Sequence, residues 1–103
     1  MKQVINGKMY DTEKATLIGE KTYGNSSDVH YDYEALYVTK KKNYFLEYAG
    51  GALSKYAEKA GSNSWGGSNG LTWYTEEMAF EWAQEHAPSE EVQKHFSHLI
   101  QEA

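Results

Sequence analysis

The chain has 103 residues, with 15 acidic and 10 basic side chains, no cysteine and one proline. This length suits one hydrophobic core, so we expect a single domain over residues 1–103. The lack of cysteine excludes disulfides, thiolate-bound metal sites and thiol nucleophiles. Nothing after Met1-Lys2 resembles a signal peptide and no stretch is apolar enough to span a membrane, so we expect a soluble, cytoplasmic protein.

The charge is unevenly distributed along the chain. Residues 71–103 contain seven glutamates and only one lysine, whereas residues 1–70 are nearly balanced. An acidic field repels nucleic acid and attracts a basic surface. All ten basic residues are lysines, and arginine is the residue best suited to bidentate contacts with phosphate or guanine. We therefore expect a basic protein surface as the partner and no direct binding of nucleic acid.

The first half of the chain is typical of a small antiparallel sheet. Asn6-Gly7 between apolar residues predicts a hairpin with a type I′ turn. The β-branched and aromatic composition of three later segments favours strands, weakly for the first of them. These strands are expected at 15–21, 31–39 and 44–48, with turns at 11–14 and 40–43 and a loop at 24–28.

The middle of the chain predicts a short helix and then a loop. Apolar residues recur at helical spacing over 52–60, and Gly61 is a plausible stop. Residues 61–70 are rich in glycine and serine around Trp65, which is typical of a loop. Residues 71–74 are expected to form a last, short strand.

Two helices are predicted at the C-terminal end. Thr75 is a good N-cap, with Glu76 and Glu77 placing negative charge in the first turn. The expected inward face of this helix is Met78, Ala79, Trp82, Ala83 and His86. Pro88-Ser89 begins a second helix with an apolar stripe of Val92, Phe96, Leu99 and Ile100. The predicted class is α+β, with a small antiparallel sheet of about four to five strands, a short middle helix and two acidic C-terminal helices.

Catalytic and metal motifs are weak throughout. Gly66–Gly70 matches the G-x-S-x-G pattern, but no strand precedes it and no helix follows it. His95 and His98, with Glu91 one turn earlier, have a spacing that a metal tolerates, yet solvated side chains are the usual explanation. We expect no catalytic, cofactor-binding or metal-binding residues and no enzymatic activity.

The strongest functional indication is the acidic helical face. Ordinary surface helices mix charges, because like charges one turn apart are destabilising. We therefore expect a basic partner to compensate this face, with Trp73, Tyr74 and Trp65 as candidate aromatic anchors. The predicted partner-binding residues are Glu76, Glu77, Glu81, Glu85, Glu90, Glu91, Trp73 and Tyr74.

An alternative uses the tyrosines of the central strands. Tyr31, Tyr33 and Tyr37 share one face of a regular strand and precede Lys40–Lys42, an arrangement that single-strand binders use to stack bases. This predicts a nucleic-acid-binding accessory protein. A packed aromatic sheet surface explains the same pattern, and the acidic chain favours that explanation.

Several short segments resemble small proteins carried by phages and other mobile elements of Gram-positive bacteria. The segments are 5–13, 36–41 with Phe45-Leu46, 50–56 and 79–83. Small acidic products of such elements include anti-CRISPR proteins, some of which imitate DNA. The resemblance implies a non-enzymatic inhibitor in the cytoplasm of the bacterial host, most concretely one that binds guide-loaded Cas9 and blocks DNA binding. It implies no functional residue.

Overall fold

The computed structural model describes residues 1–61 and 64–103. The strands are β1 (Lys2–Ile5), β2 (Lys8–Asp11), β3 (Thr16–Tyr23), β4 (Asp32–Val38), β5 (Tyr44–Gly50), β6 (Glu58–Gly61), β7 (Ser64–Gly66) and β8 (Ser68–Tyr74). The helices are α1 (Glu76–His86), α2 (Ser89–Phe96) and a 3₁₀ turn, η1 (Ser97–Leu99).

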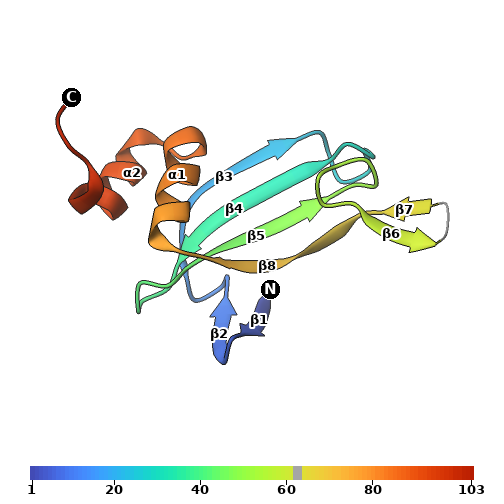
Figure 1. Cartoon of the computed structure of the whole chain (residues 1–103), viewed down its shortest axis with the longest axis horizontal. Coiled ribbons are helices and arrows are strands. Elements are labelled where there is room, and N and C mark those ends of the chain that lie inside the picture. The colour runs from blue at the N-terminus through green and yellow to red at the C-terminus, as the bar shows by residue number, and fades with distance from the viewer. Residues whose placement is uncertain (62–63) are drawn as a thin grey trace.

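A four-stranded antiparallel sheet, in the order β3-β4-β5-β8, forms the centre of the molecule. Two separate hairpins, β1–β2 and β6–β7, accompany it. The helices lie at one end of the sheet and the β6–β7 hairpin projects from the other end, so the molecule is elongated, 49 × 34 × 20 Å (Figure 1). The predicted α+β class with an antiparallel sheet is confirmed, although the strands are more numerous than expected and are divided among three sheets.

Turn residues set the first hairpin as predicted. Asn6 and Gly7 have φ angles of 51° and 78°, the left-handed conformation that a type I′ turn requires. The strands predicted around 15–21, 31–39, 44–48 and 71–74 correspond to β3, β4, β5 and β8. The backbone N–H of Thr39 donates to the carbonyl of Asn43 at 2.9 Å, which closes the expected turn between β4 and β5.

Both faces of the sheet bury apolar side chains near the helical end. Ile18, Leu36 and Leu46 pack beneath Trp82 of α1 and Phe96 of α2. On the opposite face, Tyr10 of β2 packs with Phe45 and Leu71. This end of the molecule therefore has three layers: helices, sheet and hairpin.

A bulge in β3 lets the strand meet the end of α1. The pairing with β4 shifts between Leu17 and Gly19, and Ile18 enters the helix-side core. A Cβ on Gly19 would lie 2.8 Å from the Cβ of Ala87, closer than such atoms approach. Glycine is therefore required here for the helix to seat on the strand.

The predicted middle helix over 52–60 is wrong. Residues 52–56 form turns and β6 begins at Glu58. The Oγ of Ser54 donates to the carbonyl of Gly51 at 2.8 Å and accepts from the N–H of Tyr56 at 3.1 Å. Such local bonds compete with helical ones, and Leu53, expected on the buried face, is 62% exposed.

The predicted loop over 61–70 is also wrong for most of its length. Ser64–Gly66 form β7, and Ser68 begins β8; Ser62 and Asn63 lie outside the described residues. Gly70 faces the ring of Tyr48 across the strand pair, and a Cβ there would lie 2.8 Å from the tyrosine hydroxyl. Glycine in this segment therefore admits an aromatic ring over a strand.

The C-terminal helices begin where predicted. The Thr75 hydroxyl accepts from the N–H of Met78 at 3.1 Å, so Thr75 is the N-cap of α1. Ala79, Trp82 and Ala83 are buried, but Met78, expected on the inward face, is 44% exposed. In the second stripe Phe96 is buried, whereas Ile100 is exposed. No helix within the described residues has the length and apolar character needed to cross a membrane.

Candidate protein-binding surface

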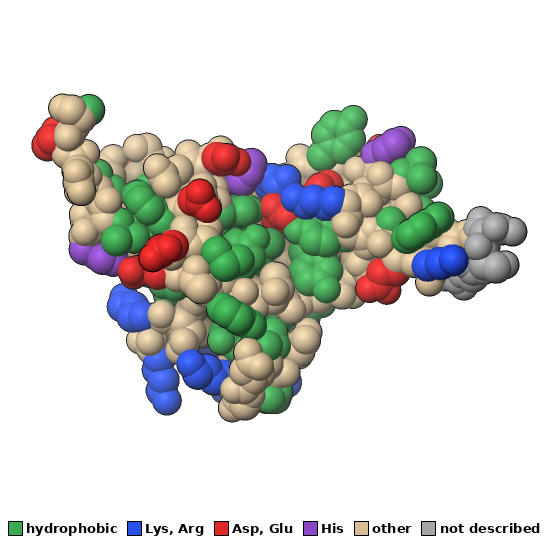
Figure 2. Space-filling model, in the orientation of Figure 1, with side chains coloured by type: hydrophobic (Ala, Val, Ile, Leu, Met, Phe, Trp, Pro, Cys, Tyr) green, Lys and Arg blue, Asp and Glu red, His purple; other side chains and the backbone are tan. Residues whose placement is uncertain are grey.

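Acidic side chains form a row along α1. Glu77, Glu81 and Glu85 follow one another every four residues and are exposed, and the helical rise places them about 6 Å apart along the axis. Figure 2 shows acidic side chains in a row over this helix, with lysines gathered below it beside the β1–β2 hairpin. The acidic row therefore faces solvent.

The helix glutamates form no ion pair with a lysine among the described residues. Glu76 lies 2.9 Å from the Nε2 of His98, and Glu85 lies 3.5 Å from that of His86. Glu91 lies 3.2 Å from His95. Histidine compensates a carboxylate only when protonated, so the row carries largely uncompensated charge when histidine is neutral.

A shallow hollow lies between α1 and the end of β8, beside the acidic row. It encloses about 530 Å³, and Tyr74, Met78, Trp82, Glu81 and Glu85 line it together with Gln84. The first three supply an apolar floor and the two glutamates supply a charged rim. Helical spacing explains the arrangement, because positions 78, 81, 82 and 85 share one side of a helix.

A buried carboxylate fixes the floor of this hollow. Glu34 on β4 is only 3% exposed and accepts a hydrogen bond from the indole Nε1 of Trp82 at 2.8 Å. Its other oxygen accepts from the Tyr56 hydroxyl and lies 2.8 Å from the Nζ of Lys55. Lys21 lies 3.7 Å away. The indole is therefore held in one orientation from below.

The same contacts keep Glu34 ionised. Burial alone would raise the pKa of its carboxyl group, but hydrogen bonds from Lys55, Tyr56 and Trp82 outweigh burial and lower the pKa to about 2. Burial, and then the negative charge of Glu34, raise the pKa of the Tyr74 hydroxyl. Tyr74 therefore stays a neutral hydrogen-bond donor at the edge of the hollow.

This combination suits a cationic side chain from another protein. The aliphatic stem of a lysine or arginine can lie on Tyr74, Met78 and Trp82, while its charged end meets Glu81 or Glu85. A cation close to an indole or phenol ring gains a further attraction to the π system. The hollow therefore offers packing, charge and hydrogen-bonding contacts for recognising a cation.

The structure places the other predicted partner-binding residues at several separate positions outside this hollow. Trp73 and Tyr74 point to opposite faces of β8, as neighbours on a strand must, and Trp73 is exposed. Glu91 lines a different hollow, beside β3, together with Glu20 and His86. Glu90 lies in the first turn of α2 and is exposed. Trp65, on β7, lies at the end of the molecule remote from the helices (Figure 1).

The tyrosine face of the sheet is largely occupied. Tyr37 stacks on Phe45 with ring centroids 5.3 Å apart, and Tyr10 covers the same phenylalanine. The Tyr33 hydroxyl donates to Glu20 at 3.3 Å, and the Tyr37 hydroxyl donates to Glu47 at 3.4 Å. These packed rings and nearby carboxylates oppose the stacking of nucleic-acid bases on this face.

The G-x-S-x-G match and the His95 and His98 pair do not form a catalytic or metal-binding arrangement in the structure. Ser68 of the G-x-S-x-G match begins β8, and its hydroxyl donates to the carbonyl of Tyr56, so no strand-to-helix elbow exists. His95 and His98 lie near different carboxylates, Glu91 and Glu76. In the described part of the chain, no three histidine or acidic side chains converge as metal ligands would.

Sequence reasoning missed Glu34 and the role of Met78. A signal for Glu34 exists, because Asp32 and Glu34 share strand parity with the apolar Leu36 and Val38. A carboxylate on the apolar face of a strand indicates a buried, paired charge. The exposure of Met78 has no such signal, since helical periodicity places it beside buried Ala79 and Trp82.

Comparisons with protein-family models, with curated proteins and with solved structures find no match to this chain.

Proposed function

We propose that this protein is a non-enzymatic inhibitor that binds a basic surface of a nucleic-acid-processing protein of the bacterial host. The most concrete candidate is guide-loaded Cas9, in the host cytoplasm, with binding of target DNA blocked. The observation that supports this proposal is the acidic row on α1 beside an apolar-floored hollow. We infer the class of target from the resemblance of segments 5–13, 36–41, 50–56 and 79–83 to small mobile-element proteins.

The row supports competition with DNA. One strand of a duplex carries a phosphate about every 3.4 Å along the helix axis, and the carboxylates of Glu77, Glu81 and Glu85 recur about every 6 Å. A lysine- or arginine-rich channel that contacts a phosphate backbone can therefore meet a carboxylate near every second phosphate position. Cas9 holds its heteroduplex in such a channel.

The hollow supplies an apolar contact surface, which a row of exposed charge lacks. Charge on an exposed rim mainly speeds association, whereas a few buried contacts provide most of the affinity. Tyr74, Met78 and Trp82 offer an apolar surface for one anchoring side chain of the partner. We therefore place the centre of the interface at this hollow, with Glu77 next to it in the acidic row. Glu76 and Glu90 are proposed as peripheral contacts, and Glu91, which lines the hollow beside β3, as a more distant one.

The test is a target-cleavage reaction with several guide-loaded Cas9 enzymes, with the protein added before or after DNA. We expect inhibition when the protein is added first, because it occupies the DNA site. The variant Glu81→Gln with Glu85→Gln should weaken inhibition by at least about tenfold, since both carboxylates at the hollow are lost. Glutamine keeps the size and the helix propensity of these residues.

Two further variants make the test specific. Glu58→Gln with Glu102→Gln changes the net charge equally at exposed positions outside the hollow, and it should leave inhibition nearly unchanged. Met78→Lys places a cation in the hollow itself and should abolish inhibition. The proposal fails if no Cas9 enzyme is inhibited, or if the Glu81 and Glu85 variant inhibits as well as the parent chain.

A further inference from the structure

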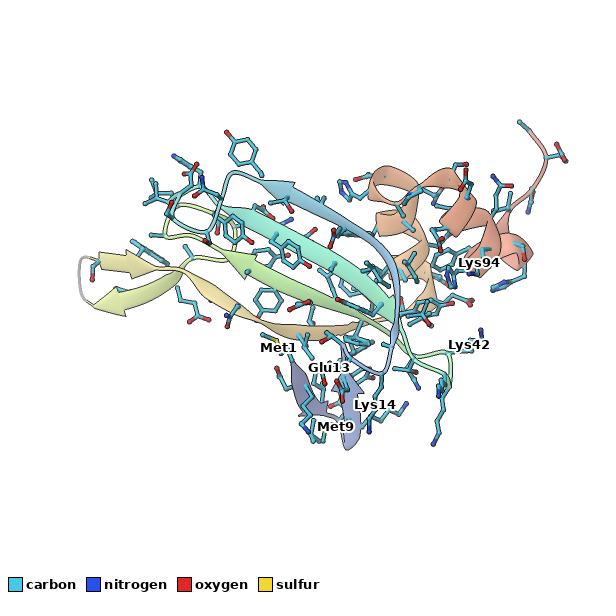
Figure 3. All side chains as sticks on the ribbon, turned by 180° about the vertical axis from the view of Figure 1, so that it is seen from behind. Met1, Met9, Glu13, Lys14, Lys42 and Lys94 are labelled. Carbon is cyan, nitrogen blue, oxygen red and sulfur yellow. The ribbon has the colours of Figure 1, made fainter. Side chains whose placement is uncertain are left out.

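A second charged site lies at the same end of the molecule, beneath the acidic row. A groove of about 960 Å³ separates the β1–β2 hairpin from the turn between β4 and β5. Four lysines line it: Lys8, Lys14, Lys40 and Lys41. We call this site the lysine groove. Figure 3 shows Lys14 and Lys42 projecting at this end, whereas Lys94 lies among the helices.

The walls of the lysine groove are joined to one another. The Nζ of Lys8, on β2, donates to the side-chain oxygen of Asn43 at 3.3 Å. The N–H of Asn43 donates to the Thr39 hydroxyl at 3.1 Å, and Lys42 adopts a φ of 67° within the same turn. The turn therefore holds Lys40 and Lys41 at a fixed edge of the groove.

The charge of the groove is positive despite two carboxylates. Asp11 and Glu13 also line it, so four lysines outnumber two acids. The Asp11 side chain accepts a hydrogen bond from the N–H of Glu13 at 2.9 Å and closes the local turn, so one of its oxygens is already engaged. The four lysines are exposed. Lys8 donates to Asn43, and none of the four lysines forms an ion pair among the described residues, so the groove presents ammonium groups that no carboxylate neutralises by direct contact.

We propose that the lysine groove binds the phosphate backbone of a nucleic-acid duplex. Lysine recognises phosphate as a point charge and needs no bidentate geometry. Tyr10 is the sole aromatic residue among the described residues that line the groove, and it is 6% exposed, so bases have no ring on which to stack. A duplex suits this groove better than a single strand, because its bases stay inside while its phosphates face outward.

The sequence argues against nucleic-acid binding through its acidic net charge and its lack of arginine. Folding collects lysines from 8–14 and 40–41 at one site and places Glu81 and Glu85 at another. The field that a phosphate meets at the groove is set by these neighbours and is screened from more distant charges within about 10 Å at moderate salt. Binding of a duplex at the lysine groove does not depend on the acidic row, so it can be tested independently of the proposed function.

Binding of a fluorescently labelled duplex DNA oligonucleotide tests this inference. The full chain should bind at about 50 mM salt and lose affinity steeply by about 200 mM. Lys40→Gln with Lys41→Gln should weaken binding about tenfold at low salt and reduce the slope of log affinity against log salt by about 2, since each phosphate contact contributes about 0.9. The matched control is Lys59→Gln with Lys94→Gln, an equal charge change at exposed residues outside the groove.

Each outcome decides the assignment. Selective loss in the Lys40 and Lys41 variant, with the control and the Glu81 and Glu85 variant still binding, supports the groove. Absence of binding at low salt overturns it, as does equal weakening by the control. Inorganic polyphosphate serves as a second probe: if it binds at the groove and the duplex does not, the groove is a phosphate site but not a nucleic-acid site, and the proposal is wrong.

Discussion

Glu34 shows how one buried charge shapes a surface. Its carboxylate holds the indole of Trp82 from beneath and the Lys55-Tyr56 turn from the side. Removing this carboxylate would leave the buried indole N–H of Trp82 without its acceptor, and an unsatisfied buried donor costs more than the hydrogen bond itself contributes. The geometry of the hollow on α1 therefore depends on a residue that never reaches its rim.

The free energy of unfolding should depend on pH because Glu34 is ionised in the folded chain. The pKa of this carboxyl group is lowered from 4.5 to about 2 in the folded chain, so its ionised form favours folding. That contribution, up to about 3 kcal/mol, is complete above pH 4.5 and is lost as the pH falls toward 2. Urea unfolding of the parent chain and Glu34→Gln at several pH values measures it.

The variant should be less stable than the parent at pH 7, and the difference should shrink to roughly half by pH 3. Glu13→Gln, at an exposed residue, should change the free energy of unfolding by less than about 0.5 kcal/mol at either pH. A difference between parent and Glu34→Gln that stays constant from pH 7 to pH 3 would contradict the assigned role.

At the scale of elements, α1 carries the acidic row because its first turn is well capped. The Thr75 hydroxyl satisfies the N–H of Met78, and Glu76 and Glu77 interact favourably with the positive end of the helix. Thr75→Ala should lower the free energy of unfolding by about 1 kcal/mol, while Thr75→Ser, which keeps the cap hydroxyl, should retain most of that stability. Thermal or urea unfolding distinguishes the two, and equal losses would show that the cap hydroxyl is not the cause.

Local signals predicted the elements that local interactions determine. Asn6-Gly7 specified its turn, Thr75 its cap, and the aromatic and β-branched runs their strands. The 52–60 segment has helical periodicity, yet Lys55 and Tyr56 bind Glu34, which is distant in sequence, and the segment forms turns and a strand instead. Propensity yields to such tertiary contacts. The prediction of a loop over 61–70 is wrong for a related reason, since Gly70 makes room for the ring of Tyr48 on the neighbouring strand.

The candidate site, too, could be predicted from the sequence only in part. The carboxylates of Glu81 and Glu85 follow from helical spacing in the sequence. The hollow beside them does not, because it exists only where α1 meets Tyr74 at the end of β8. The lysine groove likewise joins Lys8 and Lys14 to Lys40 and Lys41 through tertiary packing, so no spacing in the sequence announces it.

Over the whole molecule, two surfaces of opposite charge lie at one end (Figure 2). The acidic row suits a basic protein surface, and the lysine groove suits a phosphate backbone. A nucleoprotein offers both, and guide-loaded Cas9 combines a basic channel with bound RNA. If both proposals hold, the two surfaces should contact separate parts of one partner.

Affinity for guide-loaded and guide-free Cas9 tests this combination. Glu81→Gln with Glu85→Gln should weaken binding to both forms, because the basic protein surface is present in each. Lys40→Gln with Lys41→Gln should weaken binding only to the loaded form, which supplies the phosphates. For the loaded form, the binding free-energy losses of the two double variants should add in the quadruple variant to within about 0.5 kcal/mol, as they do for sites without shared partners. Equal loss by the lysine variant in both forms would place the groove against protein instead of nucleic acid.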